Sequence, residues 1–205
     1  MSSAPARRLR SRPLVLTTVL AVAVAVAAAA SGAGLASGAS SGLVYSRASA
    51  HVVQRQPAAG SCSQRGSGIY ARPDPGCTPG ALNLAVTQRS LATTICRSGW
   101  TATVRPPESI TAREKRASMD AYGDGASRSL YEYDHYVPLE LGGAVNDARN
   151  LWPEPDYPVR SGFYLNPKDR LERVLNRQVC DGRMTLSQAQ RLIASDWVAA
   201  FHRYG

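Results

Sequence analysis

The chain has few aromatic side chains, few histidines and few cysteines for its length. Aromatic residues make up 7% of the 205 residues, so the sequence predicts a modest hydrophobic core. Four cysteines are too few for a disulfide-dense miniprotein, and no Cys-x-x-Cys pair is present to bind a structural zinc ion. No stretch beyond the N-terminus is long and apolar enough to cross a bilayer. The length and composition of the chain therefore predict one globular domain with a tail.

The first thirty residues have the order of a secretory signal peptide. Four arginines precede an uncharged, alanine-rich run over residues 14–30, and small residues follow it. We expect residues 1–30 to be removed on export, and an uncleaved membrane anchor is the alternative interpretation of this run. Cleavage would leave 20 basic and 15 acidic residues, a net charge of +5. The sequence therefore predicts a secreted, mildly basic protein without stable membrane association, which permits attraction to polyanions.

The cysteines are expected to pair, because an even number of cysteines in an exported chain usually forms disulfides. Cys62, Cys77, Cys96 and Cys180 allow three connectivities, and the sequence alone does not choose among them. We favour Cys62 with Cys77 and Cys96 with Cys180. The second bridge would tie the N-terminal part of the domain to its C-terminal helices and stabilise it by about 3–4 kcal/mol.

Composition divides the rest of the chain into a leader and a domain. Residues 31–76 are rich in Gly, Ser and Pro and predict a flexible leader, whereas residues 77–205 predict a folded domain. The expected strands of the domain cover Thr101–Arg105, Tyr131–Leu141, which ends at Gly142 and Gly143, and a short segment at Leu151–Trp152. The expected helices cover Thr111–Tyr122, capped by Thr111 and ended by Gly123, and Lys168–Val179, which follows Pro167. A last helix is expected after a Thr185–Gln188 capping box. Together they predict an α+β fold.

The apolar residues at helical spacing are assigned to the core and given no function. In the last helix these residues are Leu186, Ala189, Ile193, Trp197 and Ala200. Trp152 is assigned to the core as well. The acidic residues Glu140 and Glu154 are expected to be exposed, and nothing else in the sequence supports a glycosidase with paired carboxylates.

One of the three histidines lies in a patterned context. His135 follows Asp134 in a β-prone run that ends in a Gly-Gly turn, and Asn150-Leu-Trp-Pro-Glu comes 15 residues later. A helix that opens with Asn166-Pro-Lys-Asp follows. An imidazole with a pKa near ~6.5 is a suitable general base at neutral pH. Because neighbouring side chains of a strand point to different sides, Asp134 can hold a cation while His135 stays free.

This order of residues resembles the HNH endonucleases, in a secreted bacterial branch of that family. The resemblance is carried by Asp-His-x-x-Pro-Leu-x-Leu-Gly-Gly from residue 134, by Asn-Leu-Trp-Pro-Glu from residue 150 and by Lys-Asp-x-x-Glu from residue 168, and it covers about 130 residues. It implies a small ββα-metal core with flanking helices, braced by disulfides. It also implies a metal-dependent endonuclease that hydrolyses phosphodiesters of DNA, or of RNA, with little sequence specificity.

The resemblance also implies roles for single residues. His135 would be the general base, and Asn150 would fix the loop between the strands and orient His135. Asp134 would bind one divalent ion, Mg²⁺ or Mn²⁺ as the first choice, with Zn²⁺ or Ni²⁺ not excluded. The family's third position lies on the helix, where Asn166 is the first candidate ligand and a helix cap is its alternative role. Two acids one turn further on, Asp169 and Glu172, are alternative ligands.

Basic residues near the motif are candidates for contact with the nucleic-acid backbone. They are Lys168, Arg149 and Arg173, although helices often carry such charges only as a solvated face. No aromatic stacking platform is evident, so readout of single-stranded sequence is not indicated. We expect a monomer that acts on DNA. Two alternatives stay open: a non-catalytic secreted polyanion-binding module on the same fold, and a membrane-tethered structural protein.

Overall fold

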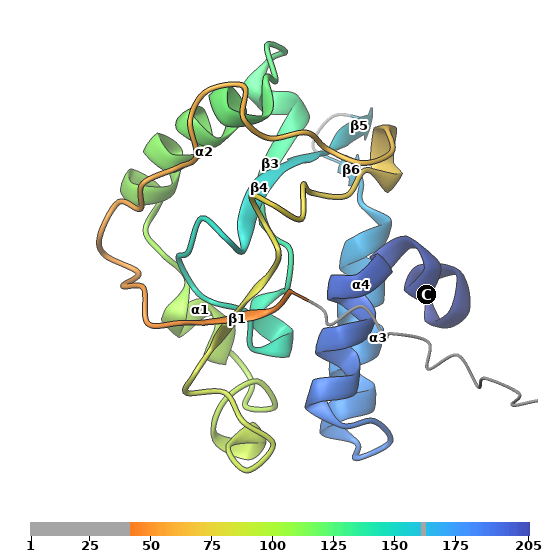
Figure 1. Cartoon of the computed structure of the whole chain (residues 1–205). Helices are drawn as coiled ribbons and strands as arrows, with labels where there is room; N and C mark the ends of the chain where they lie inside the picture. Colours follow the sequence, from red (N-terminus) through yellow and green to blue (C-terminus); the bar gives the residue numbers. More distant parts are fainter. Residues whose placement is uncertain (1–41, 161–162) are drawn as a thin grey trace, which may run out of the picture. The chain divides into compact units, whose positions relative to one another are not determined.

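The structure, a computed structural model of the chain, describes residues 42–160 and 163–205 (Figure 1). The predicted signal peptide, residues 1–30, and the first part of the predicted leader lie outside these ranges. Within them, the helices and strands in chain order are β1 (Val44–Ser46), β2 (Ala81–Asn83), α1 (Trp100–Val104), α2 (Glu108–Tyr122), β3 (Tyr131–His135), β4 (Leu151–Pro155), β5 (Tyr157–Arg160), β6 (Phe163–Leu165), α3 (Pro167–Cys180) and α4 (Leu186–Tyr204).

The strands of the described ranges form three separate two-stranded sheets. β1 pairs with β2 in parallel, whereas β3 with β4 and β5 with β6 are antiparallel. In the β3–β4 sheet, Tyr131 lies opposite Pro155 and His135 lies opposite Leu151. Helices and short strands in this proportion confirm the predicted α+β class.

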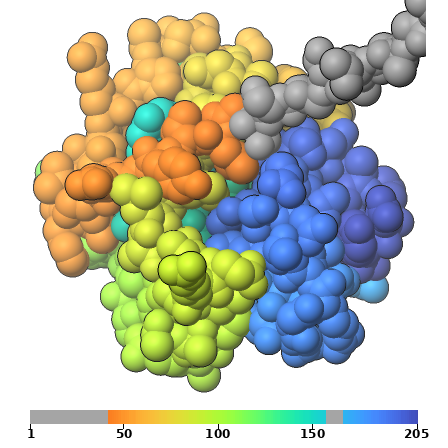
Figure 2. Space-filling view, turned by 60° about the horizontal axis from the view of Figure 1, so that its bottom comes forward, coloured from red at the N-terminus to blue at the C-terminus, as the bar shows by residue number. Residues whose placement is uncertain are grey.

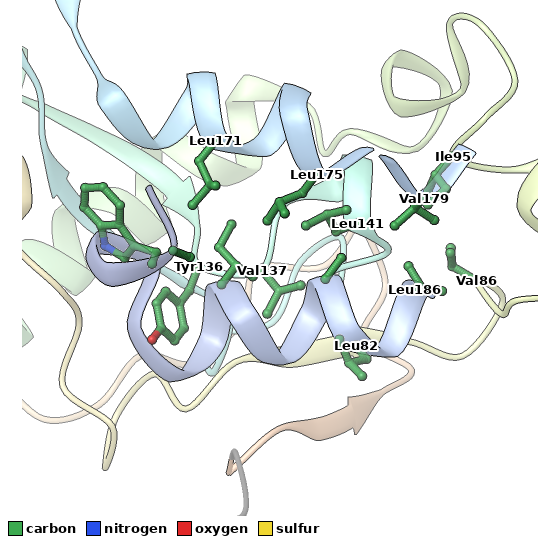
Figure 3. Close-up of a cluster of buried hydrophobic side chains, with 14 of the residues drawn as sticks. Leu82, Val86, Ile95, Tyr136, Val137, Leu141, Leu171, Leu175, Val179 and Leu186 are labelled. Atoms are coloured by element: carbon green, nitrogen blue, oxygen red, sulfur yellow. The ribbon is translucent and has the colours of Figure 1, made fainter. Parts of the chain in front are cut away.

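The hydrophobic core gathers around helices α3 and α4, which pack side by side (Figure 3). Leu171, Leu175 and Val179 of α3 face the buried side of α4, and residues of the turn after β3 fill the space between them. The predicted stripe of the last helix is confirmed, because all five of its members are buried: Leu186, Ala189, Ile193, Trp197 and Ala200.

The predicted helix starts at the C-terminal end of the chain are also confirmed. Pro167 is the first residue of α3, after the cap Asn166. The side chain of Thr185 accepts a hydrogen bond from the backbone of Gln188, and the side chain of Gln188 accepts one from the backbone of Thr185. These reciprocal bonds satisfy backbone N–H groups that the first turn of a helix leaves unpaired.

Two predictions in the middle of the chain are wrong. The run Thr101–Arg105 does not form a strand, because residues 100–104 form the short helix α1, anchored by the buried side chain of Trp100. The next helix, α2, begins three residues before the predicted cap Thr111, and its own N-cap is Pro107 without a side-chain bond. Its end is as predicted, since Gly123 takes the left-handed conformation that closes a helix.

The predicted strand over Tyr131–Leu141 is shorter than expected. β3 ends at His135, and residues 139–141 form a single 3₁₀ turn closed by Gly142 at a φ of 74°. Gly143 has no room for a side chain, because a Cβ atom there would lie 1.7 Å from the carbonyl oxygen of Val137. The Gly-Gly pair therefore packs the turn closely against the end of β3.

Residues 42–76 of the predicted leader are part of the fold. β1 lies in this segment and pairs with β2, and Figure 2 shows the residues just after residue 42 on the surface beside those near residue 80. The buried carboxylate of Glu114 accepts hydrogen bonds from Gln54 N at 2.6 Å and from Asn146 Nδ2 at 3.1 Å. Composition suggested flexibility here, but these bonds and the strand pairing attach the segment to the domain.

Both predicted disulfides are present. Cys62 is bonded to Cys77, and Cys96 is bonded to Cys180 across 84 residues of sequence. Disulfides persist in oxidising compartments such as the extracellular space. Among the described residues, no helix has the length and apolar character needed to span a membrane.

Removal of the long-range disulfide is expected to destabilise the protein more than removal of the short one. The double substitution Cys96→Ala with Cys180→Ala should lower the free energy of unfolding by about 3–4 kcal/mol, because the bridge restricts a long loop of the unfolded chain. The Cys62–Cys77 bridge closes a loop of only 15 residues, so the matched double substitution of these two cysteines should cost about 1.5 kcal/mol less. Urea unfolding of the three oxidised proteins measures both values, and equal midpoints for the two variants would contradict this ranking.

Candidate active site

Three acidic side chains of the β3–β4 sheet project toward the first turns of α3. Glu132 lies opposite Glu154 in the strand register, and Asp134 lies two residues further along β3. Alternate residues of a strand point to the same side, and directly opposed residues share that side. Glu154 is buried rather than exposed as expected, with 3% of its surface accessible. Buried acids at this position require a counter-charge.

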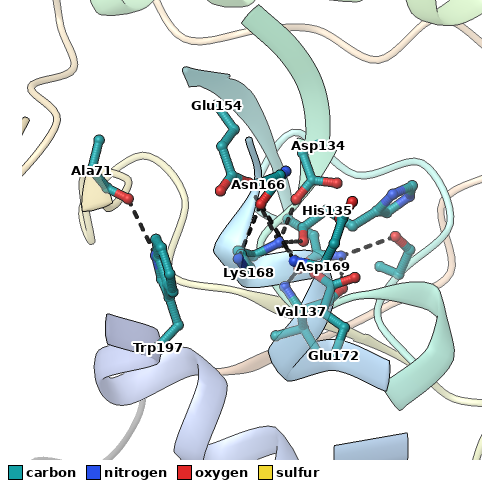
Figure 4. A network of polar contacts seen from close by, with 12 residues as sticks. Ala71, Asp134, His135, Val137, Glu154, Asn166, Lys168, Asp169, Glu172 and Trp197 are labelled. Carbon is teal, nitrogen blue, oxygen red and sulfur yellow. Dashed lines mark hydrogen bonds and ion pairs between the residues drawn. The ribbon is translucent and has the colours of Figure 1, made fainter. Parts of the chain in front are cut away.

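The counter-charge is Lys168, from the first turn of α3 (Figure 4). Its ammonium donates hydrogen bonds to the carboxylate of Asp134, to Oε1 of Glu172 at 2.6 Å and to the carbonyl oxygen of His135 at 2.9 Å. Oε2 of Glu154 lies 3.4 Å from the same nitrogen. No part of the Lys168 side chain is exposed. The predicted contact of Lys168 with a nucleic-acid phosphate does not fit this burial, because three carboxylates hold the ammonium inside the protein.

The charges of this cluster move its pKa values in different directions. Burial alone would raise the pKa of Asp134, but the charge of Lys168 and hydrogen bonds from neighbouring groups hold it below its usual value. Burial raises the pKa of Glu154 well above the usual range and that of Glu172 to about 8. Burial would lower the pKa of Lys168, yet the carboxylates around it raise that pKa well above its usual value. Asp134 and Lys168 are therefore both charged at neutral pH.

His135 is the last residue of β3, and its imidazole points away from Lys168 (Figure 4). Its Nε2 lies 3.1 Å from the carbonyl oxygen of Val145. A carbonyl only accepts hydrogen bonds, so Nε2 carries the proton and the lone pair is on Nδ1. Burial lowers the pKa of His135 to about 4, against the opposing charge of Asp134. The imidazole is therefore neutral at pH 7 and can accept a proton at Nδ1.

The lowered pKa of His135 predicts a specific pH dependence of stability. Between pH 6.5 and about 4 the unfolded chain binds a proton at this histidine and the folded protein does not, so acidification favours unfolding. Between pH 7 and pH 4.5 the wild type should lose about 1–3 kcal/mol more stability than His135→Gln, which lacks this group. Urea unfolding in the presence of EDTA at several pH values measures this difference. Parallel curves for the two proteins would show that His135 titrates normally.

Asn150 holds together the turn that joins β3 to β4. Its side chain is fully buried. Oδ1 accepts hydrogen bonds from the backbone N–H groups of Val137 at 3.0 Å and Ala81 at 3.2 Å. Nδ2 donates to the carbonyl oxygens of Val137 at 2.9 Å and Ala144 at 3.1 Å. Because Ala144 precedes Val145, these bonds also fix the carbonyl group that orients His135.

A cleft of about 220 Å³ opens beside Asp134 and His135. Its charged lining consists of five acids and two arginines, namely Glu132, Asp134, Glu140, Asp169, Glu172, Arg105 and Arg173. The charge of Asp134, with burial, raises the pKa of Glu132 to about 7. Burial and the charge of Asp134 also raise the pKa of Asp169. The carboxylates therefore repel one another across the cleft, and a cation bound between them would relieve that repulsion.

The cleft offers hard oxygen donors of the kind that Mg²⁺ and Mn²⁺ bind, but the helical donor differs from the first choice. Oδ1 of Asn166 caps α3 by accepting hydrogen bonds from the N–H groups of Lys168 at 3.0 Å and Asp169 at 3.3 Å. With Oδ1 used in the cap, the remaining polar group of the Asn166 side chain is its amide NH₂, which does not bind cations. Asp169, one of the predicted alternatives, lines the cleft together with Asp134. Glu172, the other alternative, lines the cleft too but accepts a hydrogen bond from Lys168, so Asp134 and Asp169 are the first candidate ligands for a divalent ion.

The remaining basic candidates have different surroundings. Arg149 forms a two-point ion pair with Asp147, at 2.9 Å through Nε and 2.7 Å through Nη2, and it does not line the cleft. Arg173 is exposed on α3 and lines the cleft. Arg105 also lines the cleft, although it was not among the candidates selected from the sequence. The two arginines at the cleft are therefore the stronger candidates for contact with a phosphate.

Two of the larger hollows elsewhere carry no acid in their lining, and a third, of about 530 Å³, is lined by acids, a lysine and an arginine but by no histidine. One of about 570 Å³ is lined by Leu82, Val86, Leu186 and other uncharged residues, and one of about 520 Å³ lies beside α4 with Arg183 and Arg191 in its lining. Neither of these two linings contains an acid or a histidine. The smaller cleft at the end of β3 combines a neutral imidazole, carboxylates and arginines, and it is the candidate active site.

Comparisons of the chain with family models, with curated proteins and with solved structures returned no match.

Proposed function

We propose that the protein is a secreted, metal-dependent endonuclease that hydrolyses phosphodiester bonds of DNA, or of RNA, with little sequence specificity. The observation that carries this proposal is the pairing in one cleft of a neutral imidazole, His135, with the ionised carboxylate of Asp134. The resemblance of the surrounding sequence to HNH endonucleases supports it. So does the chain order of β3, β4 and α3, in which both strands and the helix contribute to the charged cluster.

The proposed reaction is addition of water to phosphorus. Nδ1 of His135 accepts a proton from the water as its oxygen attacks, and the bond from phosphorus to the leaving ester oxygen breaks. The bond from Nε2–H to the carbonyl of Val145 keeps the ring in the tautomer that this step requires. Asn150 acts indirectly, because it fixes the turn that carries Val145.

A divalent cation would be held by Asp134 and Asp169 on the cleft side of the cluster. When bound, it would supply positive charge for the phosphate and the leaving oxygen. Arg105 and Arg173 would contact the phosphate backbone from the rim of the cleft. Contacts of this kind carry no base information, which is the reason to expect little sequence specificity.

Cleavage of a supercoiled plasmid by the purified, oxidised protein tests the proposal. We expect nicked and linear products with Mg²⁺ or Mn²⁺ and none with EDTA, and parallel reactions with Zn²⁺ and Ni²⁺ identify the preferred ion. A plasmid that stays intact with all four ions would contradict the proposed activity.

The alternative function is a polyanion-binding module without catalysis. It is favoured by one observation, the exposed arginines of α3: Arg170, Arg173 and Arg177. A protein of this kind would bind DNA with a strong dependence on salt and leave the plasmid intact with every ion. The plasmid assay, combined with a binding titration, separates the two functions.

A further inference from the structure

We propose that Lys168 is a built-in cation of the acidic cluster, filling the inner side of Asp134 so that the site takes a single divalent ion on its cleft side. The inner side is defined here as the space bounded by Asp134, Glu154, Glu172 and the carbonyl oxygen of His135. The cleft-side ion rests on the proposed function, whereas the role of Lys168 rests on the contacts of its ammonium alone.

The surroundings of the ammonium resemble those of a bound metal ion. Its neighbours within 3.4 Å include three carboxylates and one backbone carbonyl oxygen, supplied by β3, β4 and α3. Carboxylate and carbonyl oxygens are also the donors that enclose Ca²⁺ and Mg²⁺ in proteins. The three N–H bonds of the ammonium are accounted for by Asp134, Glu172 and the carbonyl of His135. The inner side is therefore fully occupied by a cation that belongs to the chain.

The charge and the burial of Lys168 explain why a second divalent ion is not expected there. Three carboxylates surround one ammonium, and that ammonium occupies the space between them. An ion beside Lys168 would meet a fixed positive charge with no access from solvent, since the side chain is fully buried. On the cleft side, by contrast, Asp134 and Asp169 both line a space that solvent can enter.

This arrangement makes Lys168 a positioning residue for Asp134. The ammonium fixes one carboxylate oxygen, Oδ2, which leaves Oδ1 for the ion on the cleft side. It also links Asp134 to α3, the helix that carries Asp169. The distance between the two proposed ligands is thus set by a salt bridge inside the protein, before any ion binds.

Removal of the ammonium should turn the inner side into a metal site. In Lys168→Met, the three carboxylates lose their counter-ion and should bind Mn²⁺. We expect the melting temperature without metal to fall, and Mn²⁺ at about 100 times its dissociation constant to raise it again by about 5–10 °C. Electron paramagnetic resonance should count two bound Mn²⁺ per molecule in this variant and one in the wild type.

Two further variants are the controls. Combining Lys168→Met with Glu154→Gln and Glu172→Gln removes the excess negative charge, so this triple variant should melt higher than Lys168→Met without metal and should not gain the second ion. Lys115→Met removes a lysine whose ammonium donates to two backbone carbonyl oxygens, those of Arg128 and Tyr131, and its loss should not be rescued by Mn²⁺.

The outcomes separate this inference from the proposed nuclease activity. If Lys168→Met binds one more Mn²⁺ than the wild type, Lys168 is the built-in cation even if no DNA is cleaved. If Lys168→Met binds no additional ion, or does not fold at any Mn²⁺ concentration, the inference is overturned even if the wild type is an active nuclease.

Discussion

Replacing His135 with glutamine is expected to lower the rate of DNA cleavage by about 10²–10⁴-fold, the usual contribution of a general base. The amide of glutamine can still donate to the carbonyl of Val145, which keeps the buried contact that His135 makes through Nε2. It has no basic nitrogen, so the proton of the attacking water has no acceptor at this position. The loss should appear in kcat rather than in the affinity for DNA, because the imidazole acts on the water and not on the bound strand.

The matched control for this prediction is His202→Gln. His202 is exposed near the end of α4, where it packs beside Tyr70 and Phe201. The same substitution there should leave the cleavage rate within a factor of about two of the wild type, since surface changes away from a site rarely matter. Full activity of His135→Gln, with the fold intact, would remove His135 from the mechanism.

The second large effect is expected from Asn150→Ala. This substitution leaves four buried backbone groups without a partner, two N–H groups and two carbonyl oxygens. Each unpaired buried group costs about 1–3 kcal/mol, partly offset by relaxation or water, so we expect a total loss of about 3–5 kcal/mol in unfolding free energy. The melting temperature and the urea midpoint of the oxidised protein measure this loss.

Asn176→Ala is the control for the buried amide. Asn176 is only partly buried and donates to two carbonyl oxygens, Ile95 at 3.4 Å and Glu140 at 2.8 Å. Its loss should cost about 1 kcal/mol. If Asn150→Ala is no more destabilising than Asn176→Ala, then Asn150 does not hold the turn between β3 and β4.

The parts of the fold predicted from the sequence are those controlled by local periodicity and capping. The buried stripe of α4 and its capping box could be predicted because five apolar residues recur at helical spacing after Thr185 and Gln188. The pattern over Thr101–Arg105 failed because alternation over five residues is a weak signal. There the side chain of Trp100, buried against the core, anchors a short helix, and the Pro106–Pro107 pair ends it.

The candidate site could be predicted where motif and chemistry coincide. Asp134, His135 and Asn150 were selected from the sequence, and the structure brings all three to the same end of the β3–β4 sheet. The role of each in catalysis stays a prediction. Glu132 and Arg105 were missed because their places in the cleft depend on strand register and on the course of the chain before α2, which local patterns do not encode.

Lys168 shows most clearly what the sequence could not provide. A lysine next to other basic residues on a helix is typical of a solvated surface. A surface lysine can contact a nucleic-acid backbone, so the sequence made Lys168 a candidate for contact with DNA. The spacing of Lys168 and Glu172 by four residues is compatible with an ion pair, but its burial requires Asp134 and Glu154 from two other elements. The same limit applies to residues 42–76, whose attachment to α2 depends on long-range hydrogen bonds, among them those from Gln54 to Glu114 and from Cys62 to Ala121.

The central claim is that Asp134 holds one divalent cation in the cleft beside the neutral imidazole of His135. Anomalous scattering from crystals of the oxidised protein grown with Mn²⁺ tests this claim most directly. We predict one ion in the cleft, with an oxygen of Asp134 and an oxygen of Asp169 at about 2.0–2.2 Å and with Lys168 still in contact with Asp134. An ordered cleft without an ion at saturating Mn²⁺, or an ion bound away from Asp134, would contradict it.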